Sequence, residues 1–222
     1  MMAKLLPGPI YATLGNHDTN PTAQDAPHSL QPDYLSDQFS WNYDHVASLW
    51  KHYGWLDSDA TQQARTHYGG YSTLTPYGLR IISLNTDFWY TSNLFNFINT
   101  TNPDVSGMLA WLITELQAAE DAKERVWIIG HVLTGFGTGA MPNSIDYFYQ
   151  IIERYSPHVI ANTFWGHSHE DQQMIYYANN GTNRNNSQGY ADALTPGWVG
   201  PSVTPLTNFN SGFRYVSTAC CL

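Results

Sequence analysis

The stretch Val159-Ile-Ala-Asn-Thr-Phe-Trp-Gly-His-Ser-His169 decides the fold class of this chain. Its apolar part predicts a buried strand from Val159 to Trp165 that delivers His167 and His169 to its carboxyl end. The two histidines are two residues apart, so an extended backbone would point both side chains to one side. Taken alone, the Gly-His-Ser-His segment could equally be an exposed strand edge.

Two further stretches repeat this pattern of an apolar run followed by glycine and metal-binding residue types. Ile10 to Leu14 predicts a short strand that runs into Gly15-Asn-His-Asp18, and Val126 to Ile129 predicts a strand that delivers Gly130-His131. Each motif has an ordinary reading, because Gly, Asn and Asp favour turns and a single strand-end histidine is often structural. Their joint occurrence, each after an apolar strand, favours one shared site.

The rest of the chain alternates between predicted helices and strands. The predicted helices are Ser40–Tyr53, Ser58–His67, Asp104–Ala122 and Ile145–Tyr155; the further strands are Leu79–Leu84, Met174–Tyr177, Val199–Pro205 and Phe213–Val216; the long polar loops are Thr19–Asp37 and Asn179–Tyr190. Alternation followed by consecutive late strands favours an α/β fold with a mixed sheet or two packed sheets. No repeat or break divides residues 1–222, so we expect one domain.

Composition excludes several functional classes. The 222 residues carry a formal net charge of −9 with only three lysines, so we expect no nucleic-acid partner. No apolar run is long enough to span a membrane, and the first residues do not form a signal peptide. The two cysteines, Cys220 and Cys221, are adjacent and set no disulfide framework. Acceptor triplets at Asn99, Asn180 and Asn185 fit a glycoprotein and give weak support for secretion.

The candidate site residues suit metal-assisted phosphate chemistry. The carboxyl ends of strands in α/β sheets converge on a crevice, where Asn16 can offer a carbonyl oxygen and His131, His167 and His169 can offer imidazole nitrogens. Such ligands suit zinc, iron or manganese, which activate water and neutralise phosphoryl oxygens. His17 follows Asn16 on a turn and can face a bound phosphate as a proton donor.

Several segments together sharpen this interpretation. They are Leu79-Arg-Ile-Ile-Ser-Leu-Asn85, Trp111-Leu112 with Glu115-Leu-Gln-Ala-Ala-Glu-Asp121, Ile128-Ile-Gly-His131, Phe164-Trp-Gly-His-Ser-His-Glu-Asp171 and Pro201-Ser-Val-Thr-Pro205. In order and spacing, from about Gly8 to Val216, the chain resembles the acid sphingomyelinase branch of the calcineurin-like metallophosphoesterases.

This resemblance carries specific expectations. It implies an α/β/β/α sandwich with mixed sheets and a zinc phosphodiesterase that cleaves sphingomyelin to ceramide and phosphocholine, reached at a membrane surface through its substrate. It implies that Asn16, His131 and His167 bind one metal of a binuclear centre, that His169 belongs to the other, and that His17 contacts the phosphate and assists protonation of the leaving group. It also implies a secreted or lysosomal (or vacuolar) parent protein.

The chain departs from the family's pattern at both ends. The family's Asp-x-His motif and its Gly-Asp motif, which carries the metal-bridging aspartate, precede Gly-Asn-His, whereas only fourteen residues precede Gly15 here and none is Asp or His. A second catalytic histidine and the first strand–helix units are missing with them. The ending Tyr215 to Leu222 departs from the expected strand. We therefore expect a partial catalytic domain, truncated at both ends, whose second metal site is incomplete.

Three functional hypotheses follow. The chain is a sphingomyelinase-type phosphodiesterase, a truncated inactive fragment or pseudoenzyme, or a phosphoesterase of the same superfamily that acts on nucleotides or phosphomonoesters. The sequence leaves open the metal, the exact substrate, the pH optimum and the oligomeric state.

Overall fold

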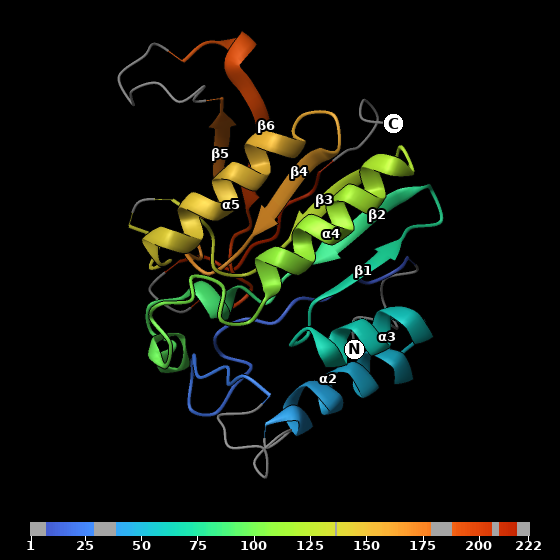
Figure 1. The fold of residues 1–222 in the computed structure, drawn as a ribbon, viewed down its shortest axis with the longest axis vertical. Helices are drawn as coiled ribbons and strands as arrows, with labels where there is room; N and C mark the ends of the chain where they lie inside the picture. The colour runs from blue at the N-terminus through green and yellow to red at the C-terminus, as the bar shows by residue number, and fades with distance from the viewer. Residues whose placement is uncertain (1–7, 29–38, 136, 179–187, 206–208, 217–222) are drawn as a thin grey trace.

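A single mixed sheet organises the molecule. The computed structural model describes residues 8–28, 39–135, 137–178, 188–205 and 209–216. Within these ranges six strands pair in the order β1-β2-β3-β4-β6-β5 (Figure 1). The strands are β1 (Tyr71–Leu74), β2 (Leu79–Ser83), β3 (Arg125–Ile129), β4 (Ile160–Trp165), β5 (Gln172–Tyr177) and β6 (Ala193–Val199). The four inner strands β2, β3, β4 and β6 are parallel, and the two edge strands are antiparallel to their neighbours. The expected mixed α/β fold is confirmed.

Two helices cover one face of this sheet. Helix α4 (Met108–Asp121) connects β2 to β3, and α5 (Pro142–Tyr155) connects β3 to β4. Both lie on the same face in Figure 1, as two successive right-handed crossovers require. The shared core includes Leu112, Leu116, Ile128, Phe148 and Ile152, all essentially inaccessible to solvent. Burial of each such side chain contributes about 1.5–3 kcal/mol.

A second pair of helices lies beyond β1 and forms its own small core. Helices α2 (Ser40–His52) and α3 (Ser58–Thr66) pack against each other and close over Tyr71. Helix α3 begins where it does because the Asp57 carboxylate accepts a hydrogen bond from the Ala60 amide at 2.8 Å, which caps its first turn. This pair flanks the segment that carries Asn16.

The element boundaries show where the sequence pattern was incomplete. The predicted helix from Asp104 begins only at Met108, because the Asp104 carboxylate instead accepts hydrogen bonds from the amides of Leu109 and Ala110. Residues 10–14 form no strand: the carbonyl of Ala12 accepts bonds from the side chains of Tyr71 and Ser83 instead of a backbone ladder.

The late strands also differ from their prediction. Strand β6 ends at Val199, the residue at which the predicted strand Val199–Pro205 begins. Residues 213–216, predicted as a strand, are irregular. The short strand β1 was not predicted. Parts of both predicted polar loops, residues 29–37 and 179–187, lie outside the described residues.

Three short 3-10 segments complete the described elements: η2 (Thr86–Trp89), η3 (Leu94–Phe97) and η4 (Tyr190–Asp192). The first two follow β2 at the end of the sheet where the glycine–histidine motifs lie. None of the helices in the described ranges has the length and apolar character that crossing a membrane requires.

Candidate metal centre

The carboxyl ends of β3 and β4 meet the turn at residues 15–18, and three donor atoms converge there. The Asn16 amide oxygen lies 2.7 Å from His131 Nε2 and 3.3 Å from His167 Nδ1. The two imidazole nitrogens are themselves 3.3 Å apart. His131 lies 115 positions and His167 lies 151 positions after Asn16 in the sequence, yet their three donor atoms form a nearly equilateral triangle.

This triangle fits a first-row transition metal. Ligands held about 2.0–2.1 Å from zinc lie roughly 3 Å from one another, close to the spacing of the three atoms. Within the described ranges no group of three or more His, Cys, Asp or Glu side chains is placed to hold a metal ion. The candidate centre therefore depends on Asn16 as its third ligand.

The other two predicted histidines lie at the edge of this cluster. His169 has a buried Nδ1 atom with no hydrogen-bond partner among the described residues, which suits a role as a metal ligand. The backbone around it is not extended as the sequence pattern suggested, because His167 and His169 have φ angles of 72° and 63°. This left-handed turn is costly for non-glycine residues and is typical of functional sites. His17 is exposed beside the cluster.

Electrostatics keep the imidazoles neutral and able to bind a cation. Burial lowers the pKa of His131 to about 4, and the neighbouring His167, His169 and His17 add to that effect. Burial also lowers the pKa of His167, with contributions from His169 and His17. At neutral pH each of these two rings is therefore neutral and has one nitrogen with a free lone pair, which metal binding requires.

Backbone and side-chain contacts fix the position of each imidazole. The Thr86 hydroxyl accepts hydrogen bonds from the amides of His131 and Val132, at 3.1 and 2.6 Å, and so anchors the end of β3. The His167 ring packs edge-on against Tyr90, with ring centroids 4.8 Å apart. Thr86 was not identified as a site residue from the sequence, although it closely follows the predicted strand Leu79–Leu84. Tyr90 belongs to the aromatic stretch from Phe88 to Tyr90, which the sequence marks as one that could line a site.

The turn that presents Asn16 is held by its own short contacts. The Gly15 amide donates to the Asp18 carboxylate at 2.8 Å, and the Ala23 amide donates to the Asn16 carbonyl at 2.6 Å. The close contact between Gly15 and His131 leaves no room for a side chain, because a Cβ at position 15 would lie 2.8 Å from the His131 ring. The turn can therefore approach the histidine only with glycine at this position.

A buried pair of carboxyl groups lies behind this turn. Asp25 and Asp87 are almost completely inaccessible, with exposed fractions of 1% and 0%. Burial, and then the proximity of Asp25, raises the pKa of Asp87 to about 9. Burial also raises the pKa of Asp25, whose carboxylate accepts a bond from the Asn85 amide at 2.9 Å. Two such neighbours share a proton at neutral pH. Asp25 sits in a polar loop, where no sequence pattern marked it.

Comparison with known proteins shows the family of this chain. Residues 1–171 match the family model described as calcineurin-like phosphoesterase. The chain belongs to this family. Members of the family are metallophosphoesterases, so hydrolase chemistry and metal ions are properties of the family to which the chain belongs.

The similar proteins are phosphodiesterases. The chain is 34% identical over 94% of its length to human sphingomyelin phosphodiesterase, of which it covers 30%. It is 35% identical over 93% of its length to sphingomyelin phosphodiesterase 2 of Caenorhabditis elegans, of which it covers 31%. It is also 33% identical over 89% of its length to the human cyclic GMP-AMP phosphodiesterase SMPDL3A, of which it covers 39%. The chain thus spans about a third of the length of these relatives.

Proposed function

We propose that this chain is the metal-binding part of a phosphodiesterase that hydrolyses sphingomyelin-type phosphocholine esters to ceramide and phosphocholine. The observation that supports it best is the convergence of the Asn16 oxygen with the His131 and His167 nitrogens at 2.7–3.3 Å. The names of the similar proteins support the substrate class.

Asn16, His131 and His167 would hold one zinc ion, and His169 would contribute to a second. When bound, zinc would act as a Lewis acid on a phosphoryl oxygen and lower the pKa of water. The fixed orientation of the three ligands, set by contacts of the turn and of the strand ends, would remove the cost of assembling the site at each turnover.

His17 would donate a proton to the leaving group. In the hydrolysis a water oxygen forms a new bond to phosphorus while the bond from phosphorus to the alcohol oxygen breaks, and that oxygen must gain a proton. His17 is exposed next to Asn16, so its imidazolium can donate this proton and later recover one from solvent.

A second candidate function is hydrolysis of a nucleotide phosphodiester, which the similarity to SMPDL3A favours. The alternative of an inactive fragment also stands, because the described residues bring together the candidate ligands of one metal only. We further propose an extracellular or lysosomal setting for the parent protein, supported by the exposed acceptor Asn99 with its Thr101.

Zinc binding tests the first part of the proposal. Equilibrium dialysis of the purified chain should show bound zinc, and His131→Ala or His167→Ala should weaken binding by about a hundredfold or more because each removes a ligand. His45→Ala is the matched control, since His45 is exposed on α2. Absence of zinc binding, or equal weakening in the control, would refute the assignment.

Hydrolysis assays then decide the substrate. The zinc-loaded chain should be compared on sphingomyelin, on cyclic GMP-AMP and on 4-nitrophenyl phosphate. Preference for sphingomyelin supports the first function, and preference for the cyclic dinucleotide supports the second. Zinc binding without turnover of any of the three would identify the chain as an inactive fragment.

A further inference from the structure

A cavity of about 640 Å³ opens beside His17. One wall is the loop that runs from His17 to Gln24, and the opposite wall is aromatic, formed by Phe39, Trp41 and Tyr43 with Phe95. The volume lies in the range of small-molecule sites, which are commonly 300–1,000 Å³. His17 lines this cavity and also lies beside the candidate centre, so the cavity lies next to the place where a phosphate would bind.

The chemistry of the walls selects against anions. Among the described residues, the cavity lining contains no lysine or arginine, and the carboxylate of Asp18 is its one fixed charge. Phe39 and Phe95 meet edge to face, with ring centroids 5.8 Å apart, and so join the start of α2 to η3. A nucleotide with further phosphates would find no cation here, whereas a hydrocarbon group would find aromatic surface.

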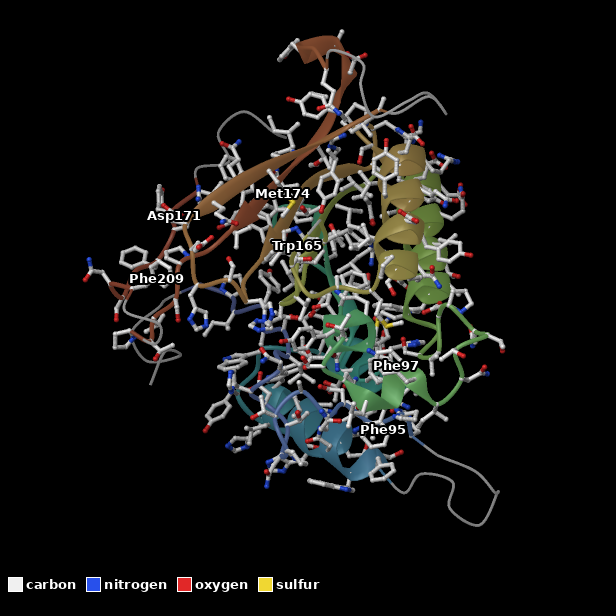
Figure 2. The ribbon with its side chains drawn as sticks, turned by 90° about the vertical axis from the view of Figure 1, so that its left-hand side faces the viewer. Phe95, Phe97, Trp165, Asp171, Met174 and Phe209 are labelled. Atoms are coloured by element: carbon white, nitrogen blue, oxygen red, sulfur yellow. The ribbon has the colours of Figure 1, made fainter. Side chains whose placement is uncertain are left out.

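The aromatic wall continues outward over η3. Next to Phe95, the side chains of Leu94, Phe97 and Ile98 are 69%, 47% and 56% exposed. We call these three residues the apolar rim. Figure 2 shows Phe95 and Phe97 side by side on η3, close to the start of α2. Clustered exposed apolar residues of this kind mark a binding surface more often than isolated ones do.

From these observations we propose that the cavity receives the hydrophobic alcohol of the phosphodiester and that the apolar rim contacts the lipid surface from which the substrate is drawn. The proposal rests on the proposed function, because it places the leaving group on the side of the phosphate where His17 can protonate it. The proposal specifies that the leaving group is an aliphatic alcohol and that it binds against Trp41 and Phe95. It also specifies that the adjoining membrane is zwitterionic.

Vesicle sedimentation tests the rim without any need for metal or hydrolysis. The whole chain should sediment with phosphatidylcholine vesicles, and Leu94→Ser or Phe97→Ser should raise the lipid concentration for half-binding about tenfold, because each removes a side chain that lipid would bury. Tyr77→Ser is the matched control, since Tyr77 is 79% exposed in the β1–β2 turn. No vesicle binding, or the same loss in the control, would overturn the role of the rim.

Quenching by brominated lipid tests the cavity. Vesicles of phosphatidylcholine with brominated acyl chains should quench the tryptophan fluorescence of the chain, and Trp41→Phe should remove most of that quenching while leaving sedimentation intact. Equal quenching in the variant, or its abolition by choline chloride, would overturn the cavity assignment and indicate a headgroup site. Loss of zinc binding or hydrolysis alone would count against the proposed function but not against these results.

Discussion

Replacement of Asp87 by asparagine should make the stability of the protein less dependent on pH. The folded protein keeps a proton on the buried Asp25–Asp87 pair, since the pKa of Asp87 is raised to about 9 from an ordinary value of 3.8. The unfolded chain loses that proton above about pH 5. Stability from this group is therefore complete below pH 4 and is lost as the pH rises toward 9.

The size of the change in unfolding free energy follows from the one proton that the folded protein keeps and the unfolded chain loses. A difference of one bound proton changes the free energy of unfolding by about 1.36 kcal/mol per pH unit, so the wild type should lose roughly 2.7 kcal/mol from this pair between pH 5 and pH 7. The Asp87→Asn variant should show a smaller loss, because its amide can donate a hydrogen bond to an ionised Asp25, while the burial that raises the pKa of Asp25 remains. The stability of the variant relative to wild type should rise with pH by up to this amount.

Urea unfolding at pH 5, 6 and 7 measures this difference directly. Asp146→Asn is the control, because Asp146 is an exposed carboxylate on α5 and its replacement should run parallel to wild type. Asp25→Asn should keep part of the pH dependence, since burial, the main cause of the raised pKa of Asp87, would remain. If Asp87→Asn also runs parallel to wild type, the pair does not share a proton and the reasoning is refuted.

Three further substitutions test what positions the candidate ligands. Gly15→Ala should weaken zinc binding roughly 10–100-fold in equilibrium dialysis, because its Cβ would push the His131 ring away, and unchanged affinity would show that the close approach is not needed. Thr86→Val should lower the free energy of unfolding by roughly 1–3 kcal/mol in urea, because the amides of His131 and Val132 lose their acceptor; a neutral result would contradict that anchor. Asp57→Ala should cost about 1 kcal/mol through loss of the α3 cap and leave zinc affinity unchanged; a change in affinity would mean that α3 and the site are coupled.

The sequence predicted β2, β3 and β4 well because their signals are local. Apolar runs of five or six residues ending in glycine mark β3 and β4, and the helical spacing of Leu109, Leu112 and Leu116 marks the helix between β2 and β3. Residues 10–14 have the same apolar character yet form no strand. The backbone carbonyl of Ala12 in this segment instead accepts hydrogen bonds from the side chains of Tyr71 and Ser83, a tertiary contact that periodicity cannot reveal.

The proximity of the candidate ligands was predictable in part, but their geometry was not. His131 and His167 follow β3 and β4, whose carboxyl ends converge, whereas Asn16 follows a segment that forms no strand and reaches them through the turn at residues 15–18. The left-handed backbone at His167 and His169 was not foreseen, because histidine rarely adopts it and only the surrounding packing imposes it. The proximity of Asp25 and Asp87 depends on a loop without periodic pattern, and so was invisible.

The loop from Gly15 to Asp25 explains how an amide can serve as a metal ligand here. A neutral carbonyl oxygen is a weak ligand, so it contributes only if its position costs nothing at the moment of binding. Hydrogen bonds to the backbone of the loop support that position: the Ala23 backbone amide donates to the Asn16 backbone carbonyl, and the Asn93 side-chain amide donates to the backbone carbonyl of Asp25 at 2.9 Å. Asp25, one member of the buried carboxyl pair, is the last residue of this loop, and its partner Asp87 lies in η2. Ionisation of the second carboxyl of this pair would therefore strain the segment that carries Asn16, which predicts that zinc affinity falls at alkaline pH in wild type but not in Asp87→Asn.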